Sequence, residues 1–139
     1  MTLDTILDNF EFLDDWEDKY RYVIELGRAL PEFPAESQND INKVEGCVSQ
    51  VWLIKTISKD EDDPVITYQG DSDAHIVKGL VAIVLAAFSG KRASAIQAFD
   101  TNAMFKQIGL NEHLTPQRSN GLNSMVQRIK ADATSILAS

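Results

Sequence analysis

The chain opens with two stretches in which apolar residues recur every three or four positions, the spacing of an α-helix. The apolar positions of the first stretch are Leu3, Ile6, Leu7 and Phe10. The second stretch runs from about Asp14 to Leu30, and Asp14 with Glu17 matches the spacing of a capping box. Glu17 and Arg21 form an opposite-charge pair four residues apart. Two helices are therefore predicted, and Pro31 ends the second.

The middle of the chain changes to the composition of β-strands. Residues 51–57 and 65–69 are rich in β-branched and aromatic side chains, and a charged turn, 59–64, separates them. We predict an antiparallel hairpin, with residues 42–45 as a candidate third strand. Because a two-stranded hairpin is marginal on its own, helices must cover one of its faces.

Helical spacing returns near residue 73 and continues to the end of the chain. Residues 73–88 are apolar almost all round, which is typical of a helix at the centre of a domain. A short helix is predicted over 92–99, and another between an N-cap at Asp100 and an end at Gly109. The last helix begins near Thr115, with Pro116 at its first position. This order predicts one α+β domain over residues 1–139, with a small antiparallel sheet of two or three strands covered by several helices.

Composition and charge narrow the possible functions. The 139 residues are 44% hydrophobic and 24% charged, as in a folded globular protein, and the net charge of −8 argues against a nucleic-acid binder. The longest apolar run, 79–88, is too short to span a bilayer, and the first residues lack a secretory signal, so we expect a cytoplasmic protein and no membrane partner. Seven acids and no base lie in residues 1–18, forming either a solvated helix face or an acidic docking surface.

Cys47 is the single cysteine of the chain and the main candidate for chemistry. A lone cysteine excludes an intramolecular disulfide and a zinc or iron–sulfur site built from several cysteines, and we expect no metal site. The thiol follows Gly46 and precedes the first predicted strand by four residues, which places it in a loop. It is either a buried small hydrophobe or a reactive thiol whose ionisation is assisted by a nearby base or cation.

Other residues leave alternatives open. His75 or His113 could act as the general base for Cys47 in a thiol hydrolase, although neither lies in a supporting local motif. The Gly-Asp-Ser sequence at 70–72 matches a nucleophile motif of serine esterases, but a strand-to-helix turn with Asp or Ser as the N-cap explains it more simply. A third alternative is a structural adaptor in which Cys47 is inert.

Several segments, taken together and in order, resemble the SufE family, the sulfur-acceptor partners of cysteine desulfurases. The matching segments are Gly-Cys-Val-Ser-Gln-Val-Trp at 46–52, Gly-Asp-Ser-Asp-Ala at 70–74 with Ile-Val-Lys-Gly-Leu at 76–80, and Leu-Thr-Pro at 114–116 with Arg-Ser-Asn-Gly-Leu at 118–122. Earlier segments, 16–20 and 26–31, match as well. The resemblance therefore covers most of the chain.

The resemblance implies a specific function. Cys47 would accept sulfane sulfur as a persulfide from a cysteine desulfurase, stimulate that enzyme and pass the sulfur to an iron–sulfur scaffold complex. The pyridoxal phosphate belongs to the desulfurase, so this chain would need no cofactor and would act as an accessory protein. A CsdE-like acceptor, which serves a different desulfurase and sulfur pathway, is the alternative within the family. A homodimer is also left open.

The resemblance also suggests roles for the residues around Cys47. Gly46 would give the cysteine loop its freedom, and Gln50 and Trp52 would anchor the strand that follows. Asp73 and Arg118 would shape the loop or dock it.

Overall fold

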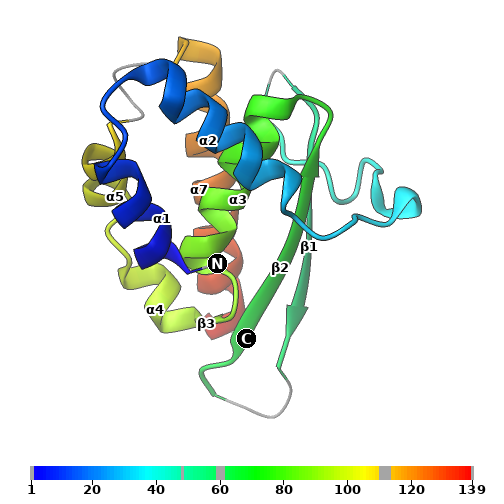
Figure 1. Cartoon of the computed structure of the whole chain (residues 1–139). Coiled ribbons are helices and arrows are strands. Elements are labelled where there is room, and N and C mark those ends of the chain that lie inside the picture. The colour runs from blue at the N-terminus through cyan, green and yellow to red at the C-terminus, as the bar shows by residue number, and fades with distance from the viewer. Residues whose placement is uncertain (1, 48, 59–61, 110–113, 139) are drawn as a thin grey trace.

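A small antiparallel sheet lies beside a group of helices in the computed structural model, which describes residues 2–47, 49–58, 62–109 and 114–138 (Figure 1). The helices are α1 (Leu3–Glu11), α2 (Trp16–Arg28), α3 (His75–Phe88), α4 (Ala93–Ala98), α5 (Thr101–Ile108) and α7 (Pro116–Ala138), with a 3-10 turn, η1 (Ala35–Ser37). The strands are β1 (Val51–Ile57), β2 (Val65–Ser72) and β3 (Lys91–Arg92), in the order β1-β2-β3. The predicted α+β class is confirmed.

The hairpin forms where the sequence predicted it, but the third strand does not. β1 and β2 pair antiparallel from Val51 opposite Ser72 to Ile57 opposite Ile66, so β2 runs three residues past its predicted end at Gln69. The predicted strand over 42–45 is wrong, because this segment makes a single bridge, between Lys43 and Trp52. The third strand is β3, whose first residue pairs with Ile66 just before the short helix α4.

Two predicted helix starts also need correction. The second helix begins at Trp16, and its N-cap is Asp15, whose carboxylate accepts a hydrogen bond of 2.8 Å from the Asp18 amide. The predicted capping box of Asp14 and Glu17 is therefore wrong by one residue. The central helix begins at His75 and not at Asp73, with Ala74 as an N-cap that has no side-chain hydrogen bond.

The remaining helix ends agree with the sequence. Asp100 caps α5 by accepting a hydrogen bond of 3.0 Å from the Ala103 amide, and Gly109 ends α5 with a left-handed backbone. Pro116 is the first residue of α7. No helix in the described ranges combines the length and apolar character needed to cross a membrane.

Helix α3 lies at the centre of the core and positions the floor of the site described below. Its fully buried side chains include Leu80, Val81, Ile83, Val84 and Phe88. Helix α2 crosses α3 at Gly27 and Gly79, where a methyl group added to Gly27 would lie 2.7 Å from the Gly79 backbone nitrogen. Only glycine permits this close approach, so the crossing fixes α3 against the N-terminal helices.

A half-buried carboxylate joins α7 to both long strands. Asp132 on α7 accepts a hydrogen bond of 2.9 Å from the Tyr68 hydroxyl on β2 and lies 3.2 Å from the Lys55 ammonium on β1. The Arg128 guanidinium, one helical turn earlier, lies 3.6 Å from the same carboxylate. Burial and the Asp132 charge raise the pKa of Tyr68 well above its ordinary value, so the hydroxyl keeps its proton and remains a donor.

We expect Asp132→Ala to lower the free energy of unfolding by about 1–3 kcal/mol, because it leaves the Tyr68 hydroxyl and two cations without their shared acceptor. Urea denaturation measures this change. Glu17→Ala is the matched control: its ion pair with Arg21 lies on side chains that are 79% and 68% exposed, and its loss should cost no more than about 0.5 kcal/mol. Equal effects of the two substitutions would contradict the role given to Asp132.

Candidate functional site

Cys47 lies in a loop that connects β1 to a short segment hydrogen-bonded beside it. The Val44 amide donates a hydrogen bond of 2.8 Å to the Val51 carbonyl, and the Leu53 amide donates one of 2.9 Å to the Asn42 carbonyl. Residues 42–44 and 51–53 are thereby held side by side, and residues 45–50 connect them. We call residues 45–50 the cysteine loop.

Gly46 is the residue at which the cysteine loop turns against α7. Its φ angle is +90°, a conformation that side chains with a Cβ rarely adopt. A methyl group at this position would also lie only 2.5 Å from the Ser124 hydroxyl oxygen on α7. Both the backbone conformation and the close contact with Ser124 therefore require glycine.

The Cys47 thiol is half-buried and faces α7. It donates a long hydrogen bond to the Gly121 carbonyl, with 3.6 Å between sulfur and oxygen. The side chain borders a cavity of about 270 Å³, whose walls also include Ser49, Val77, Leu80, Thr115, Gln117, Arg118, Gly121, Leu122 and Met125. The cavity therefore has an apolar floor from α3 and α7 and a polar rim from the start of α7.

The far end of the cysteine loop is held by the corner between β2 and α3. The Gln50 amide donates a hydrogen bond of 3.0 Å to the Asp73 carboxylate, and the Asp73 amide donates one of 3.3 Å to the Gln50 carbonyl. The Ser72 hydroxyl donates to the same carbonyl at 2.7 Å. Three hydrogen bonds thus fix Gln50.

Ser72 is unsuited to the role of an exposed nucleophile. Its hydroxyl also accepts a hydrogen bond of 3.3 Å from the Ala74 amide, and the residue is 8% exposed. The Gly-Asp-Ser sequence is a strand-to-helix corner, as the sequence favoured, but the expected capping of α3 by Asp or Ser is wrong, since Ala74 occupies the N-cap. Asp73 instead holds the cysteine loop.

Asp71 is an important residue that the sequence interpretation missed. It lies opposite Trp52 in the sheet, and both residues are buried. Its carboxylate accepts a hydrogen bond of 2.8 Å from the Gln38 side-chain amide and lies 3.4 Å from the Lys78 ammonium on α3. The available signal was its place between Gly70 and Ser72 in a polar corner.

Arg118 is brought to the same cavity as Cys47, although 71 positions separate them in the sequence. Its backbone amide donates a hydrogen bond of 3.3 Å to the Thr115 hydroxyl in the first turn of α7. The side chain is half-buried, and no carboxylate in the described part of the chain forms an ion pair with its guanidinium. Arg118 thus places a guanidinium-bearing side chain on the wall of the cavity that Cys47 borders.

Comparison with known proteins assigns the chain to a family. The family model "SufE: Fe-S metabolism associated domain" matches residues 4–133. The chain belongs to the SufE family. A SufE-like protein of Rhizobium meliloti is 61% identical over 95% of this chain and 94% of its own length, and one of Rhizobium etli is 61% identical over 95% and 89%.

A solved structure supports the fold of this SufE-family chain. The solution structure of a hypothetical protein from Thermus thermophilus superposes with a TM-score of 0.74 and covers 100% of both chains. Its sequence identity is 19%, so the likeness concerns the fold alone.

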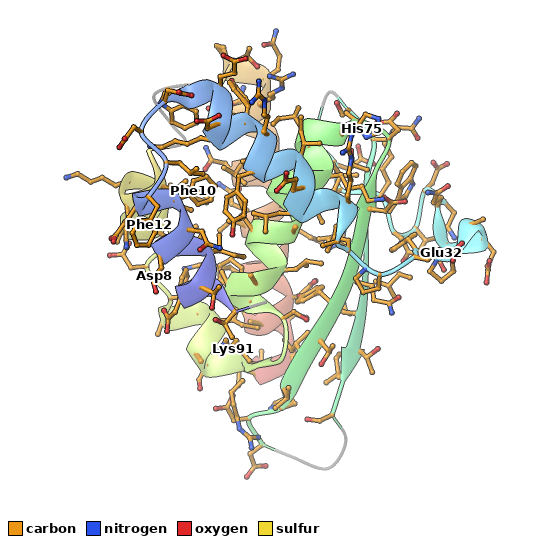
Figure 2. The ribbon with its side chains drawn as sticks, in the orientation of Figure 1. Asp8, Phe10, Phe12, Glu32, His75 and Lys91 are labelled. Atoms are coloured by element: carbon orange, nitrogen blue, oxygen red, sulfur yellow. The ribbon has the colours of Figure 1, made fainter. Side chains whose placement is uncertain are left out.

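Of the two histidines considered as a general base for Cys47, one lies in the described part of this SufE-family chain. His75 is the exposed first residue of α3 and is absent from the described walls of the cavity (Figure 2). His113 lies outside the described residues. Within the described ranges, no three or more histidines, cysteines and acids come close enough together to hold a metal ion.

The surroundings of Cys47 suppress its ionisation in this conformation. Burial raises the pKa of the Cys47 thiol above its ordinary value, the Glu45 carboxylate raises it further, and the Lys43 ammonium acts in the opposite direction. The resting thiol therefore holds its proton at neutral pH, and a base or cation that arrives later would increase the thiolate fraction.

We expect the rate of Cys47 alkylation by iodoacetamide to reach half its maximum at a pH above about 8.5, the ordinary thiol value. Glu45→Gln should lower this midpoint, because it removes a negative charge that opposes the thiolate, and Lys43→Gln should raise it. The two shifts should therefore have opposite signs. Asp8→Asn, on the exposed face of α1, is the charge-matched control. Equal shifts in all three variants would contradict this local effect.

Proposed function

We propose that this protein is a sulfur acceptor of iron–sulfur metabolism, in which Cys47 takes sulfane sulfur from a cysteine desulfurase as a persulfide. The protein would stimulate the desulfurase and then pass the sulfur from Cys47 to an iron–sulfur scaffold complex. The observation that carries the proposal is the position of the single thiol: it lies on a loop, half-buried against α7, and borders a cavity that also contains Arg118. Membership of a family associated with Fe–S metabolism supports it.

The transfer resembles thiol–disulfide exchange. The Cys47 thiolate attacks the outer sulfur of a donor persulfide, a bond forms between the two sulfurs, and the bond between the donor's two sulfurs breaks. The donor cysteine leaves as a thiolate, and the proton of the outer sulfur either stays on the new persulfide or is released to solvent. The sulfane sulfur keeps its oxidation state, so the step needs no external oxidant or reductant.

Sulfur transfer requires a thiol that is protected between transfers and accessible during them. A thiol held against α7 with a raised pKa is a poor nucleophile, which limits its oxidation between transfers. Transfer requires the opposite, since the rate depends on access to the sulfur and on the thiolate fraction. The cysteine loop would therefore leave the cavity when the donor binds.

The neighbouring residues have separate roles in this proposal. Gly46 permits the backbone turn that brings Cys47 to α7, and Trp52 fixes the start of β1 in the core. Asp73 holds Gln50 and so sets the resting position of the loop. Arg118 supplies a cation on the wall of the same cavity, where it would attract the anionic partners and products of the transfer.

The decisive experiment is intact mass spectrometry after the protein is mixed with a cysteine desulfurase and free cysteine. We expect a gain of one sulfur atom, located at Cys47 by peptide mapping and removed by a reducing agent. Cys47→Ser should gain no sulfur, while Ser135→Ala, at an exposed position of α7 outside the cavity, should behave as the unchanged chain. Sulfur addition to Cys47→Ser would contradict the proposal.

We expect Arg118→Ala to reduce stimulation of the desulfurase by about tenfold, which corresponds to one charge-assisted interaction of about 1.4 kcal/mol. The melting temperature should not change, because Arg118 forms no ion pair within the described residues. Arg21→Ala, which removes an exposed guanidinium on α2, is the control. Unchanged stimulation would remove Arg118 from the mechanism, and a lowered melting temperature would give it a structural role.

A further inference from the structure

Two large hydrophobic side chains are left exposed in the described part of the chain. Ile41 is 85% exposed and Phe12 is 84% exposed. Phe12 is the C-cap of α1, beside the acidic N-terminal helices. Ile41 lies in the segment between α2 and the cysteine loop. Single exposed apolar residues are common, so the surroundings of each must decide whether it has a function.

The segment that presents Ile41 is held together by its own polar side chains. The Asn42 side-chain amide donates a hydrogen bond of 3.0 Å to the Ser37 carbonyl, and the Asn39 side-chain amide donates one of 2.9 Å to the Glu36 carbonyl. The Asn42 backbone amide also donates to the Asn39 side-chain oxygen at 3.2 Å. We call residues 35–42 the Ile41 turn.

The Ile41 turn is fixed to the body of the protein at two points. The Gln38 side-chain amide donates to Asp71, which forms an ion pair with Lys78 on α3. The Asn42 carbonyl accepts the hydrogen bond from Leu53 in β1. Figure 1 shows this segment (cyan) projecting past β1, on the side away from α1 and α4. The turn therefore presents an isoleucine on a pre-ordered support.

The cysteine loop and Ile41 lie at the two ends of the same short segment, residues 42–44. Six positions separate Ile41 from Cys47, so the two residues lie at most roughly 20 Å apart at about 3.3 Å per residue. One side of a standard protein interface covers about 800 Å², a patch with a radius of about 16 Å. Such a patch is about 32 Å across, so one partner that covers Cys47 can cover Ile41 as well.

The charges around Ile41 define the chemistry of its partner. Glu36, Asp40 and Glu45 are exposed, and Lys43 is the one base among residues 35–45. An apolar contact with a charged rim is the usual anatomy of a protein interface. The matching surface on the partner would be an apolar recess bordered by basic side chains.

We propose that Ile41 is an anchor residue for the sulfur donor, inserting into an apolar recess beside the donor's persulfide cysteine. This inference rests on the proposed function, because it assumes that a desulfurase approaches Cys47. The Ile41 turn loses little conformational entropy on binding, since its hydrogen bonds already order it. Full burial of one isoleucine is enough to change an affinity by about 10- to 100-fold.

The test is the dissociation constant of the full-length chain for its desulfurase, measured by titration calorimetry. We expect Ile41→Ser and Ile41→Glu to raise Kd by about 10- to 100-fold, and Ile41→Leu to stay within about threefold of the unchanged chain. Phe12→Ser is the matched control, since Phe12 is equally exposed and lies across the molecule from Glu32 at the start of the connecting segment (Figure 2). It should leave Kd unchanged.

Persulfide formation separates this inference from the proposed function. At saturating desulfurase, Ile41→Ser should still gain one sulfur on Cys47, because the thiol and its cavity are intact. An unchanged Kd for both Ile41→Ser and Ile41→Glu would overturn the inference while leaving sulfur acceptance standing. A raised Kd for Phe12→Ser alone would overturn it too, by placing the donor on the acidic N-terminal helices. Failure of the unchanged chain to bind or accept sulfur would overturn both proposals.

Discussion

The polar corner at residues 71–73, where β2 passes into α3, is the constraint on which the arrangement of the site depends. Asp71 holds the Ile41 turn through Gln38 and ties it to Lys78, while Ser72 and Asp73 hold Gln50 at the end of the cysteine loop. Three consecutive residues thus position two segments that lie before β1 in the sequence. The corner follows a fully paired strand and precedes the most buried helix, so it is a firm support for the segments that it holds.

The two ends of the cysteine loop are held with different strength. Among the described residues, its C-terminal end has three hydrogen bonds with the corner, whereas the Cys47 side chain has one long hydrogen bond, to the Gly121 carbonyl. A neutral sulfur contact of this kind contributes little to stability. Its loss would therefore leave the hydrogen bonds between residues 42–44 and 51–53 intact. In the proposed transfer, the thiol would be buried in the cavity at rest and exposed when the partner binds. The partner would then also change the environment that sets the pKa of the Cys47 thiol.

The elements with strong periodicity could be predicted from the sequence, and the contacts that build the site could not. The apolar run of α3, the hairpin, the Asp100 cap and Pro116 at the start of α7 all follow from local rules. The N-cap of α2 was placed one residue early because Asp14 and Asp15 are equally good caps, and β3 has only two residues, too few for any period. Asp73 with Gln50 and Gly46 with Ser124 are joined only by the tertiary fold, so a single sequence contains no local signal for them.

The single cysteine limits the order of events in the proposed cycle. The chain has no second thiol that could attack a persulfide on Cys47, so the sulfur can leave only to another molecule. Donor and acceptor would therefore reach the same sulfur, through the same loop and the same face of the protein. Two proteins of ordinary interface size cannot cover that face together, since one footprint already extends from the cysteine loop to the Ile41 turn. In the proposed cycle, donation and delivery would then be separate encounters, and between them the persulfide would depend on the cavity against α7 for protection.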